Sequence, residues 1–331
     1  MRAAVLAEYG SSPRVDEHPD PVGSGPLRVV DVVAAGLNPV DLAVASGSFY
    51  AGGPPPPYVV GREGIGRGAD GSLFYFDSPV PPFGAAAEQA LVHPDSCFPL
   101  PSGIDPGLAI CCGIAGMAAW LSLEWRAQLT PGEAVLVLGA SGVVGQIAVQ
   151  AARLLGAGTV VAASRDPDSE FYLRSLGADA VVLLDGSTDL PEAVRGSVPE
   201  GVNVVVDPVW SEPAVAALGC LAVGGRLVQI GAASGPTATI SASLVRGRLL
   251  SVLGHSNILA PRHVKRAAYG RMVEHVAAGQ LTARVERVPL DAAEEAWARQ
   301  GSSHGFKLVL MPDLDTEDTR RDADRCTSWV S

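Results

Sequence analysis

The stretch Ala134-Val-Leu-Val-Leu-Gly-Ala-Ser-Gly-Val-Val-Gly145 decides the fold, because it combines a buried strand, a glycine turn and the start of a helix. Residues 146–156 then place apolar side chains at three- and four-residue steps, which predicts the helix itself. Gly139 permits the tight turn, Gly142 lets the backbone approach a pyrophosphate, and Gly145 lets the helix pack closely. Free N–H groups at the helix start favour phosphate. The stretch predicts a dinucleotide cradle, although a glycine triplet alone also suits a ligand-free turn.

The segments after this helix favour the nucleotide-binding interpretation. Four further strand-like runs follow, most of them separated by enough residues for a crossover helix: 159–163, 180–184, 202–207 and 226–230. Strands that alternate with helices are typical of a parallel, doubly wound sheet. The sequence therefore predicts an α/β fold with a Rossmann-type nucleotide-binding domain.

The end of the second strand indicates which dinucleotide is bound. NAD-binding domains usually carry an acidic residue there, which holds the ribose 2′-hydroxyl. Here the strand ends with Ser164 and Arg165. A guanidinium can pair with a 2′-phosphate, so we expect NADPH as the cofactor. The alternative is that Arg165 is a solvated loop charge, neutralised by Asp166 and Asp168.

Length, composition and charge limit the function classes. The 331 residues are 47% hydrophobic, and the mean hydropathy is +0.24, which allows two domains and a large core. The net charge of -11 argues against binding to nucleic acid or to an anionic membrane, so we expect a small-molecule partner. No apolar run is long enough to span a bilayer and the first residues lack a signal-peptide pattern, so we expect a cytoplasmic location.

The cysteines suggest neither a disulfide framework nor a zinc ribbon. They are odd in number and form no CxxC pair: Cys97, Cys111, Cys112, Cys220 and Cys326. We expect reduced thiols.

The texture of the chain predicts four segments. The first hundred residues are β-rich, with strands at 3–7, 27–35 and 90–93 between glycine- and proline-rich loops. We expect a first domain at 1–107, the nucleotide-binding domain at 108–254, a returning segment at 255–312 with a helix at 262–278 and a strand at Lys307–Met311, and a mobile or surface-wrapped polar tail at 313–331 that Trp329 could anchor.

Several segments together resemble the medium-chain dehydrogenase/reductase superfamily, particularly its zinc-independent quinone oxidoreductase and enoyl reductase branch. The segments are 34–41 (AAGLNPVD), 61–66 (GREGIG), 116–120 (GMAAW), 138–145, 176–179 (LGAD), 224–231 (GGRLVQIG) and 305–310 (GFKLVL). The resemblance implies a GroES-like β-barrel catalytic domain, completed by the C-terminal segment, with nicotinamide and substrate in the cleft beside the nucleotide-binding domain. It also implies a homodimer formed through the edge of the nucleotide-domain sheet. Residues 249–253 are the candidate edge, or equally an internal strand.

The resemblance also bears on metal binding. Zinc-dependent relatives have Cys at the position of Asn38 and His at the position of Arg62, with a second Cys in a loop that resembles Cys111-Cys112-Gly113. Only Cys112 retains a ligand type, and one thiolate cannot form a site that needs three protein ligands, so we expect no metal. Cys111 and Cys112 are expected to be buried packing residues. Without a Lewis acid, reduction of an electrophilic quinone or α,β-unsaturated carbonyl is favoured over alcohol oxidation.

Three residues of the first domain are implied as catalytic: Asn38, Tyr50 and Arg62. Asn38 would hydrogen-bond the substrate or the cofactor's ribose and amide, while Asp41 braces the same loop. Tyr50 lies one residue beyond the place where relatives carry a tyrosine, so the proton comes from Tyr50 or from water. Arg62 would stabilise an enolate or quinol oxygen, or else it only pairs with Glu63 or another acid.

The cofactor-binding set combines the glycine turn with positions implied by the resemblance. His255 follows Gly254 in a region that borders the nicotinamide in relatives, where it could act as an acid or simply pack. Aromatic side chains at 74–76 and 83 line the acceptor pocket or belong to the core. The full set is Asn38, Gly139, Ser141, Gly142, Val143, Val144, Gly145, Ser164, Arg165, Ile230, Gly231, Gly254 and His255.

These observations predict a zinc-independent, NADPH-dependent reductase that transfers hydride to a quinone or an α,β-unsaturated carbonyl. One alternative is a dedicated enoyl reductase of a biosynthetic, polyketide-like pathway. An alternative of another class is a non-catalytic NADPH-binding protein with a structural or redox-sensing role.

Overall fold

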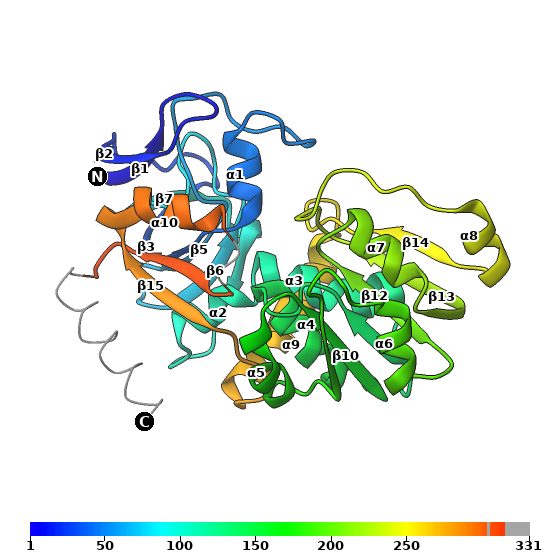
Figure 1. Ribbon diagram of the computed structural model, residues 1–331. Helices are drawn as coiled ribbons and strands as arrows, with labels where there is room; N and C mark the ends of the chain where they lie inside the picture. Colours follow the sequence, from blue (N-terminus) through cyan, green and yellow to red (C-terminus); the bar gives the residue numbers. More distant parts are fainter. Residues whose placement is uncertain (303–304, 315–331) are drawn as a thin grey trace. The chain divides into compact units, whose positions relative to one another are not determined.

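The computed structural model describes residues 1–302 and 305–314. The chain divides into two compact units (Figure 1). Unit 1 contains Met1–Ile114 together with the described residues from Ala283 onward, and unit 2 is Ala115–Thr282. The chain therefore leaves unit 1 after residue 114 and returns at residue 283, later than the expected boundaries at 107 and 255. Most of the predicted tail, including Trp329, lies outside the described residues.

The later return has a physical reason in helix α9 (Arg262–Ala277). Its buried face, which includes Tyr269 and Met272, belongs to unit 2. The chain beyond the helix stays with the same unit, because Gln150 of helix α4 (Val143–Leu154) donates to the carbonyl of Thr282 at 2.7 Å and accepts from its N–H at 2.9 Å. The predicted helix is thus present, but it belongs to the nucleotide-binding unit and not to the returning segment.

Unit 2 is built on six parallel strands in the order β11-β10-β9-β12-β13-β14, with helices along the sheet (Figure 1). In chain order this is the 3-2-1-4-5-6 arrangement of a doubly wound nucleotide-binding fold, and its switch point lies between β9 and β12. The prediction of such a sheet is confirmed. The strands are β9 (Ala134–Val137), β10 (Thr159–Ser164), β11 (Ala180–Leu183), β12 (Val202–Asp207), β13 (Leu221–Gln229) and β14 (Ser251–Gly254).

The helices of unit 2 follow from the apolar patterning of the segments between strands. In α4 every residue from Gly145 to Ala152 is buried, and β9 is buried along its whole length, which is typical of a parallel strand covered on both faces. The helices are α3 (Ile114–Leu121), which begins at the last residue of unit 1, the π-helix η2 (Ser122–Ala127), α4, η3 (Pro167–Ser169), α5 (Glu170–Ser175), α6 (Leu190–Ser197), α7 (Ser211–Leu218), α8 (Ala242–Arg248) and α9.

Strand β14 is an edge strand, so residues 249–253 lie at an edge and not inside the sheet. Val252 is 40% exposed and Leu249 is 71% exposed. The opposite edge is β11.

Unit 1 contains two sheets. One has the order β2-β1-β4, and the other has the order β15-β16-β3-β5-β6-β8, with β7 paired to β3. The strands are β1 (Arg2–Leu6), β2 (Arg14–Glu17), β3 (Arg28–Gly36), β4 (Tyr58–Val59), β5 (Glu63–Arg67), β6 (Leu73–Asp77), β7 (Gln89–Val92), β8 (Cys97–Pro99), β15 (Val285–Pro289) and β16 (Lys307–Met311). The helical segments are α1 (Pro39–Ala45), η1 (Pro94–Ser96), α2 (Pro106–Cys111), η4 (Leu290–Ala292) and α10 (Ala293–Gln300).

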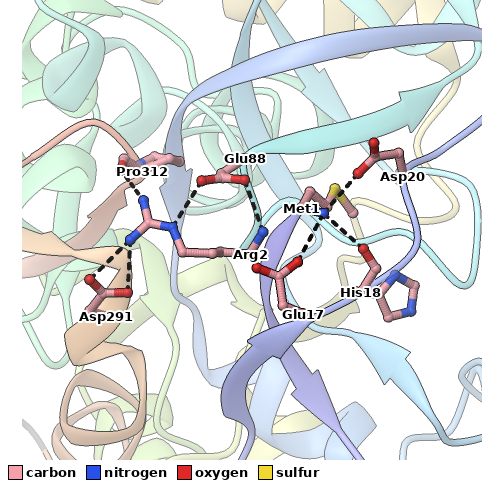
Figure 2. Close-up of polar contacts among 8 residues, drawn as sticks. All are labelled: Met1, Arg2, Glu17, His18, Asp20, Glu88, Asp291 and Pro312. Atoms are coloured by element: carbon pink, nitrogen blue, oxygen red, sulfur yellow. Dashed lines mark hydrogen bonds and ion pairs between the residues drawn. The ribbon is translucent and has the colours of Figure 1, made fainter.

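The two ends of unit 1 are joined by strand pairing and by ion pairs. Strand β16 lies between β15 and β3, so the predicted strand 307–311 completes a sheet made by the first hundred residues. Figure 2 shows Arg2 reaching from β1 to both Glu88 and Asp291, with hydrogen bonds of 2.9 and 3.0 Å. The same guanidinium donates to the carbonyl of Pro312. The returning segment is therefore part of the core structure of unit 1.

No helix in the described part of the chain is both long enough and apolar enough to cross a bilayer.

Candidate functional site

The glycine turn after β9 has the geometry that a phosphate cradle needs. Gly139 has φ +58°, a left-handed conformation that glycine adopts without strain. At Gly142 an added Cβ would have only one close neighbour, the carbonyl oxygen of Gly139 at 3.4 Å, so the backbone is open to approach. At Gly145 a Cβ would collide with Gly139 and Ala140, which explains why this helix turn can lie against the strand end.

Helix α4 begins at this turn without a side-chain cap. Gly142 is the N-cap residue and has no side chain to cap the helix, so no side chain of the described residues satisfies the N–H groups of Val143, Val144 and Gly145 in the first turn. Ser141 contributes its carbonyl oxygen, which accepts from Gln146 Nε2 at 2.7 Å and fixes the turn. The turn thus offers backbone donors and the positive end of a twelve-residue helix to an anion.

The end of β10 carries the predicted phosphate-binding pair, but its two members differ. Ser164 is 1% exposed, and its hydroxyl accepts from Asp166 N and Ser169 Oγ, both at 3.0 Å, so it braces the loop. Arg165 is exposed. Among the residues that the structure describes, neither Asp166 nor Asp168 forms an ion pair with Arg165, and the predicted alternative of a locally neutralised arginine has no support.

Two buried side-chain atoms without a partner lie at the carboxyl edge of the same sheet. Asp207 ends β12, where Oδ1 accepts from Val209 N and Trp210 N at 2.9 and 2.8 Å, while Oδ2 has no partner among the described residues. His255 follows β14, and in the part of the chain that the structure describes its Nδ1 has no partner. In open α/β sheets this edge is where the nucleotide binds, so both acceptors fit the donor groups of a dinucleotide. The sequence analysis missed Asp207, although a single acid closing an apolar strand was a usable signal.

The surroundings of His255 fix its protonation. Its Nε2 lies 2.8 Å from Asn257 Oδ1. Its ring packs edge-on against Trp125, with the ring centroids 6.0 Å apart. Burial lowers the pKa of His255, so the imidazole is neutral near pH 7, and donation from Nε2 leaves Nδ1 as an acceptor. Arg126 holds the preceding turn by donating to the carbonyl of Gly254 at 2.9 Å. This geometry favours an acceptor role over the predicted role of an acid.

The backbone after β12 is strained beside the glycine turn. Trp210 and Ser211 have φ values of 58° and 57°, which non-glycine residues rarely adopt. Val209 lies next to the glycine turn, since a Cβ on Gly139 would lie 3.1 Å from Val209 Cγ1. The adjoining end of β13 contributes Ile230 and Gly231; the N–H of Ile230 donates to the carbonyl of Asp207 at 2.9 Å. Strain of this kind concentrates at ligand sites.

In unit 1, Asn38 is the N-cap residue of α1 and is 3% exposed. Its Nδ2 donates to Glu63 Oε1 at 2.8 Å and to the carbonyl of Gly36 at 3.2 Å. Its Oδ1 accepts from Lys307 Nζ at 2.6 Å. The predicted catalytic amide is therefore held by two buried charges, which the sequence analysis did not identify.

Glu63 and Lys307 form a buried ion pair at 2.6 Å, and they are 0% and 2% exposed. Glu63 also accepts from Tyr75 Oη at 3.0 Å and from Ile114 N at 2.6 Å. Lys307 occupies the Glu63 carboxylate, so within the described residues Glu63 pairs with Lys307 and not with Arg62. The alternative that Arg62 pairs with another acid stays a prediction. A lysine within the apolar strand β16 was the signal for this pair, but its partner lies 244 residues away in the chain.

Asp41 and Arg62 lie beside this pair. The Asp41 carboxylate is 3% exposed and accepts from Asn38 N at 2.8 Å and Arg62 N at 3.1 Å, so it braces the loop as expected. Burial and the nearby Glu63 raise the pKa of Asp41 to about 6, although Lys307 acts in the opposite direction. The Arg62 side chain is partly exposed, and no side-chain partner for it is found within residues 1–302 and 305–314.

The tyrosines of unit 1 differ in exposure. Tyr50 is 74% exposed and packs on Phe49 with ring centroids 4.6 Å apart, so solvent reaches its hydroxyl. Tyr58 is 5% exposed, and its hydroxyl has no partner within residues 1–302 and 305–314. Burial raises the pKa of Tyr58 to about 12, which makes it a poor proton donor. Tyr75 and Phe76 are fully buried, so these two members of the aromatic run 74–76 belong to the core.

The residues at the positions where zinc-dependent relatives hold their metal do not fit a zinc ion. The Asn38 amide is held by Glu63 and Lys307, the Arg62 guanidinium is a cation that does not ligate zinc, and Cys111 and Cys112 are buried, at 1% and 0% exposure. Burial raises the pKa of Cys111 to about 12, which disfavours a thiolate. Across the described ranges, no three or more His, Cys, Asp and Glu residues gather in a way that suits a metal.

Comparison with known proteins places the chain in a family. The sequence model of the zinc-binding dehydrogenase family matches residues 143–269. Quinone oxidoreductase-like protein 2 of Rattus norvegicus is 30% identical over 263 residues, which cover 76% of this chain and 74% of the relative. Prostaglandin reductase-3 of Mus musculus is 31% identical over 267 residues, with 76% and 69% covered.

A solved structure extends the likeness to both units. The quinone oxidoreductase of Thermus thermophilus, whose structure is described together with its NADPH complex, has a TM-score of 0.80 and 30% identity. The match covers 94% of this chain and 100% of that one. The expected fold class, a GroES-like domain followed by a Rossmann domain, is thereby confirmed. The chain belongs to the medium-chain dehydrogenase/reductase superfamily, in its quinone oxidoreductase and enoyl reductase branch.

Proposed function

We propose that this protein is a zinc-independent, NADPH-dependent reductase of quinones or α,β-unsaturated carbonyl compounds. One observation carries the proposal: an uncapped helix N-terminus at the switch point of the sheet, with the exposed Arg165 where an NAD-binding domain has an acid. The names of the relatives, which include quinone and prostaglandin reductases, support the same reaction class.

The mechanism assigns binding to unit 2 and orientation to unit 1. NADPH, when bound, supplies the hydride. The first turn of α4 binds the pyrophosphate, and Arg165 binds the 2′-phosphate. Ile230, Gly231, Gly254 and the acceptor Nδ1 of His255 hold the nicotinamide side.

Unit 1 then acts on the electron-accepting substrate. Asn38 orients the reactants, and the Arg62 guanidinium stabilises the negative charge that develops on the substrate oxygen. The exposed Tyr50, or water beside it, delivers the proton.

The first experiment measures oxidation of NADPH and NADH in parallel against a small quinone, an α,β-unsaturated ketone and a saturated ketone. We expect turnover of the quinone or the enone with NADPH, and none of the saturated ketone. Tight NADPH binding without turnover of any of the three would contradict the proposal and favour the non-catalytic alternative. Turnover restricted to bulky enoyl thioesters would favour the biosynthetic alternative.

We further propose a cytoplasmic homodimer. The exposed apolar edge strand β14 supports the dimer, because unpaired edges favour association with a second strand. The reduced cysteines expected from the sequence support the location.

A further inference from the structure

The buried charges around Asn38 restrict what this residue can do. Both hydrogens of its amide are used, one by Glu63 and one by the carbonyl of Gly36. Within residues 1–302 and 305–314 its oxygen receives one hydrogen bond, from Lys307, and keeps a second lone pair. A flip of the amide would place its NH₂ against the ammonium and its oxygen against the carboxylate, so the two charges fix its direction.

The surrounding backbone is shaped to hold these charges. A Cβ on Gly36 would lie 2.7 Å from Glu63 Oε1 and 2.9 Å from Lys307 Nζ. A Cβ on Gly113 would overlap Glu63 and Tyr75. Glu63 accepts four hydrogen bonds, and no oxygen of its carboxylate is left unpaired. Replacing a buried ion pair with apolar residues is often neutral or stabilising, so stability alone does not account for such a site.

We infer that Glu63 and Lys307 are positioning residues for Asn38: they hold its amide so that Asn38 accepts a hydrogen bond from its ligand and does not donate one. The inference rests on the proposed function, in which Asn38 faces the reactants. The ligand group that Asn38 contacts is then an N–H or O–H donor, and not a carbonyl oxygen.

The same charges act on Asp41, which braces the loop. Asp41 is faced by Glu63 of β5, Lys307 of β16, Arg62 and Tyr58. Glu63 raises the pKa of Asp41 and Lys307 lowers it. Removing Lys307 therefore raises the pH at which Asp41 becomes protonated, and removing Glu63 lowers that pH.

The test uses the full chain with three variants, Lys307→Met, Glu63→Gln, and the double variant Glu63→Gln/Lys307→Met. The single variants leave one buried charge unpaired, so we expect them to unfold at lower urea concentration. The double variant leaves none, so we expect it to regain a midpoint close to that of the wild type. Its kcat stays roughly ten- to a hundredfold low, because neutral side chains no longer fix the direction of the amide. A double variant with wild-type stability and wild-type kcat would overturn the inference.

A pH profile gives a second readout that a purely structural role does not move. The acid limb of kcat shifts to higher pH in Lys307→Met and to lower pH in Glu63→Gln. Arg299→Met is the control, because it breaks a more exposed ion pair in the same unit, the pair of Arg299 with Glu286. This variant should leave the acid limb of kcat at the pH of the wild type. Equal shifts in both single variants would contradict the inference.

Failure of the proposed function has a different signature. In that case the wild type fails to oxidise NADPH with any of the electron-accepting substrates, and the activities of the variants carry no information. The pH dependence of unfolding, measured without any ligand, then still reports whether Lys307 and Glu63 move the Asp41 pKa in opposite directions, and equal movement overturns the inference.

Discussion

Arg165 is the residue from which the preference for NADPH follows most directly. It is exposed at the end of β10, and its guanidinium has no partner in the described ranges. We expect Arg165→Ala to weaken NADPH binding roughly ten- to a hundredfold, the worth of a hydrogen bond between charged groups, and to leave NADH binding unchanged. Dissociation constants from quenching of tryptophan fluorescence measure both.

Arg195→Ala provides the matched control, because Arg195 is an exposed arginine of α6 in the same unit. It should change neither constant. An unaltered NADPH-to-NADH preference in Arg165→Ala would remove Arg165 from the site and with it the reason for choosing NADPH.

Among individual residues, the sequence predicted those whose roles depend on residues close to them in the chain. Gly139 and Gly145 were found because a turn, a helix start and a strand end follow one another directly. Glu63 and Lys307 were not found, because an ion pair between distant segments has no local pattern. Tyr50 was named by position alone, and the structure gives it an exposed side chain that contacts Phe49.

In the strand-turn-helix element, Gly142 is expected to serve NADPH binding and Gly145 is expected to serve stability. A Cβ at Gly142 meets nothing closer than 3.4 Å, so Gly142→Ala should keep the free energy of unfolding within about 0.5 kcal/mol of the wild type. It should still weaken NADPH binding roughly tenfold, because the methyl group occupies the approach to the backbone. Gly145→Ala should instead lose about 1–3 kcal/mol of stability through overpacking.

Urea unfolding and NADPH titration of both variants test this pair. Similar stability losses at the two positions would show that the turn relaxes around either methyl group. The cradle assignment would then lose its structural basis.

Asp41, in the first turn of helix α1, makes the free energy of unfolding depend on pH. The pKa of Asp41 is about 6 in the folded chain, against 3.8 for the unperturbed group. A raised pKa means that the folded state binds the proton more tightly, so this contribution is present below pH 4 and is lost as pH rises through 6. Relative to Asp41→Asn, the wild type should lose about 2 kcal/mol of unfolding free energy between pH 4 and pH 7.

Urea midpoints at half-unit pH steps, measured on both proteins, check the sign and the window. Parallel curves for the wild type and Asp41→Asn would mean that Asp41 titrates normally. A difference that grows in the opposite direction would mean that Lys307 outweighs burial.

Element positions were well predicted where apolar periodicity is strong. The strand at Lys307–Met311 was placed without error, and the helix at 262–278 ends one residue earlier in the structure. Its unit was misassigned, because periodicity shows that a helix has a buried face but not which core that face meets. The π-helix at Ser122–Ala127 was missed for a related reason, since it depends on packing and not on composition.

At the scale of the whole molecule, strand β14 provides the test of the dimer. Val252→Lys places a charge on the edge strand. Natural proteins carry charged residues on edge strands, where they prevent pairing with a second chain. We expect the wild type to elute as a dimer in size-exclusion chromatography with light scattering, and Val252→Lys as a monomer. Leu183→Lys on the opposite edge strand β11, where Leu183 is 39% exposed, should remain dimeric. A monomeric wild type would end the proposal.

The place of β16 inside a sheet of unit 1 also sets an order of events during synthesis. Unit 2 is a single continuous stretch, so every strand of its sheet is available once residue 254 has left the ribosome. Strand β3 pairs with β5 and β7, which are made early, but it lacks its third partner until Lys307–Met311 emerges. We expect residues 1–114 to remain incompletely folded until residues 283–311 have been made, and chaperones that hold unfolded chains to bind the earlier segment during that interval.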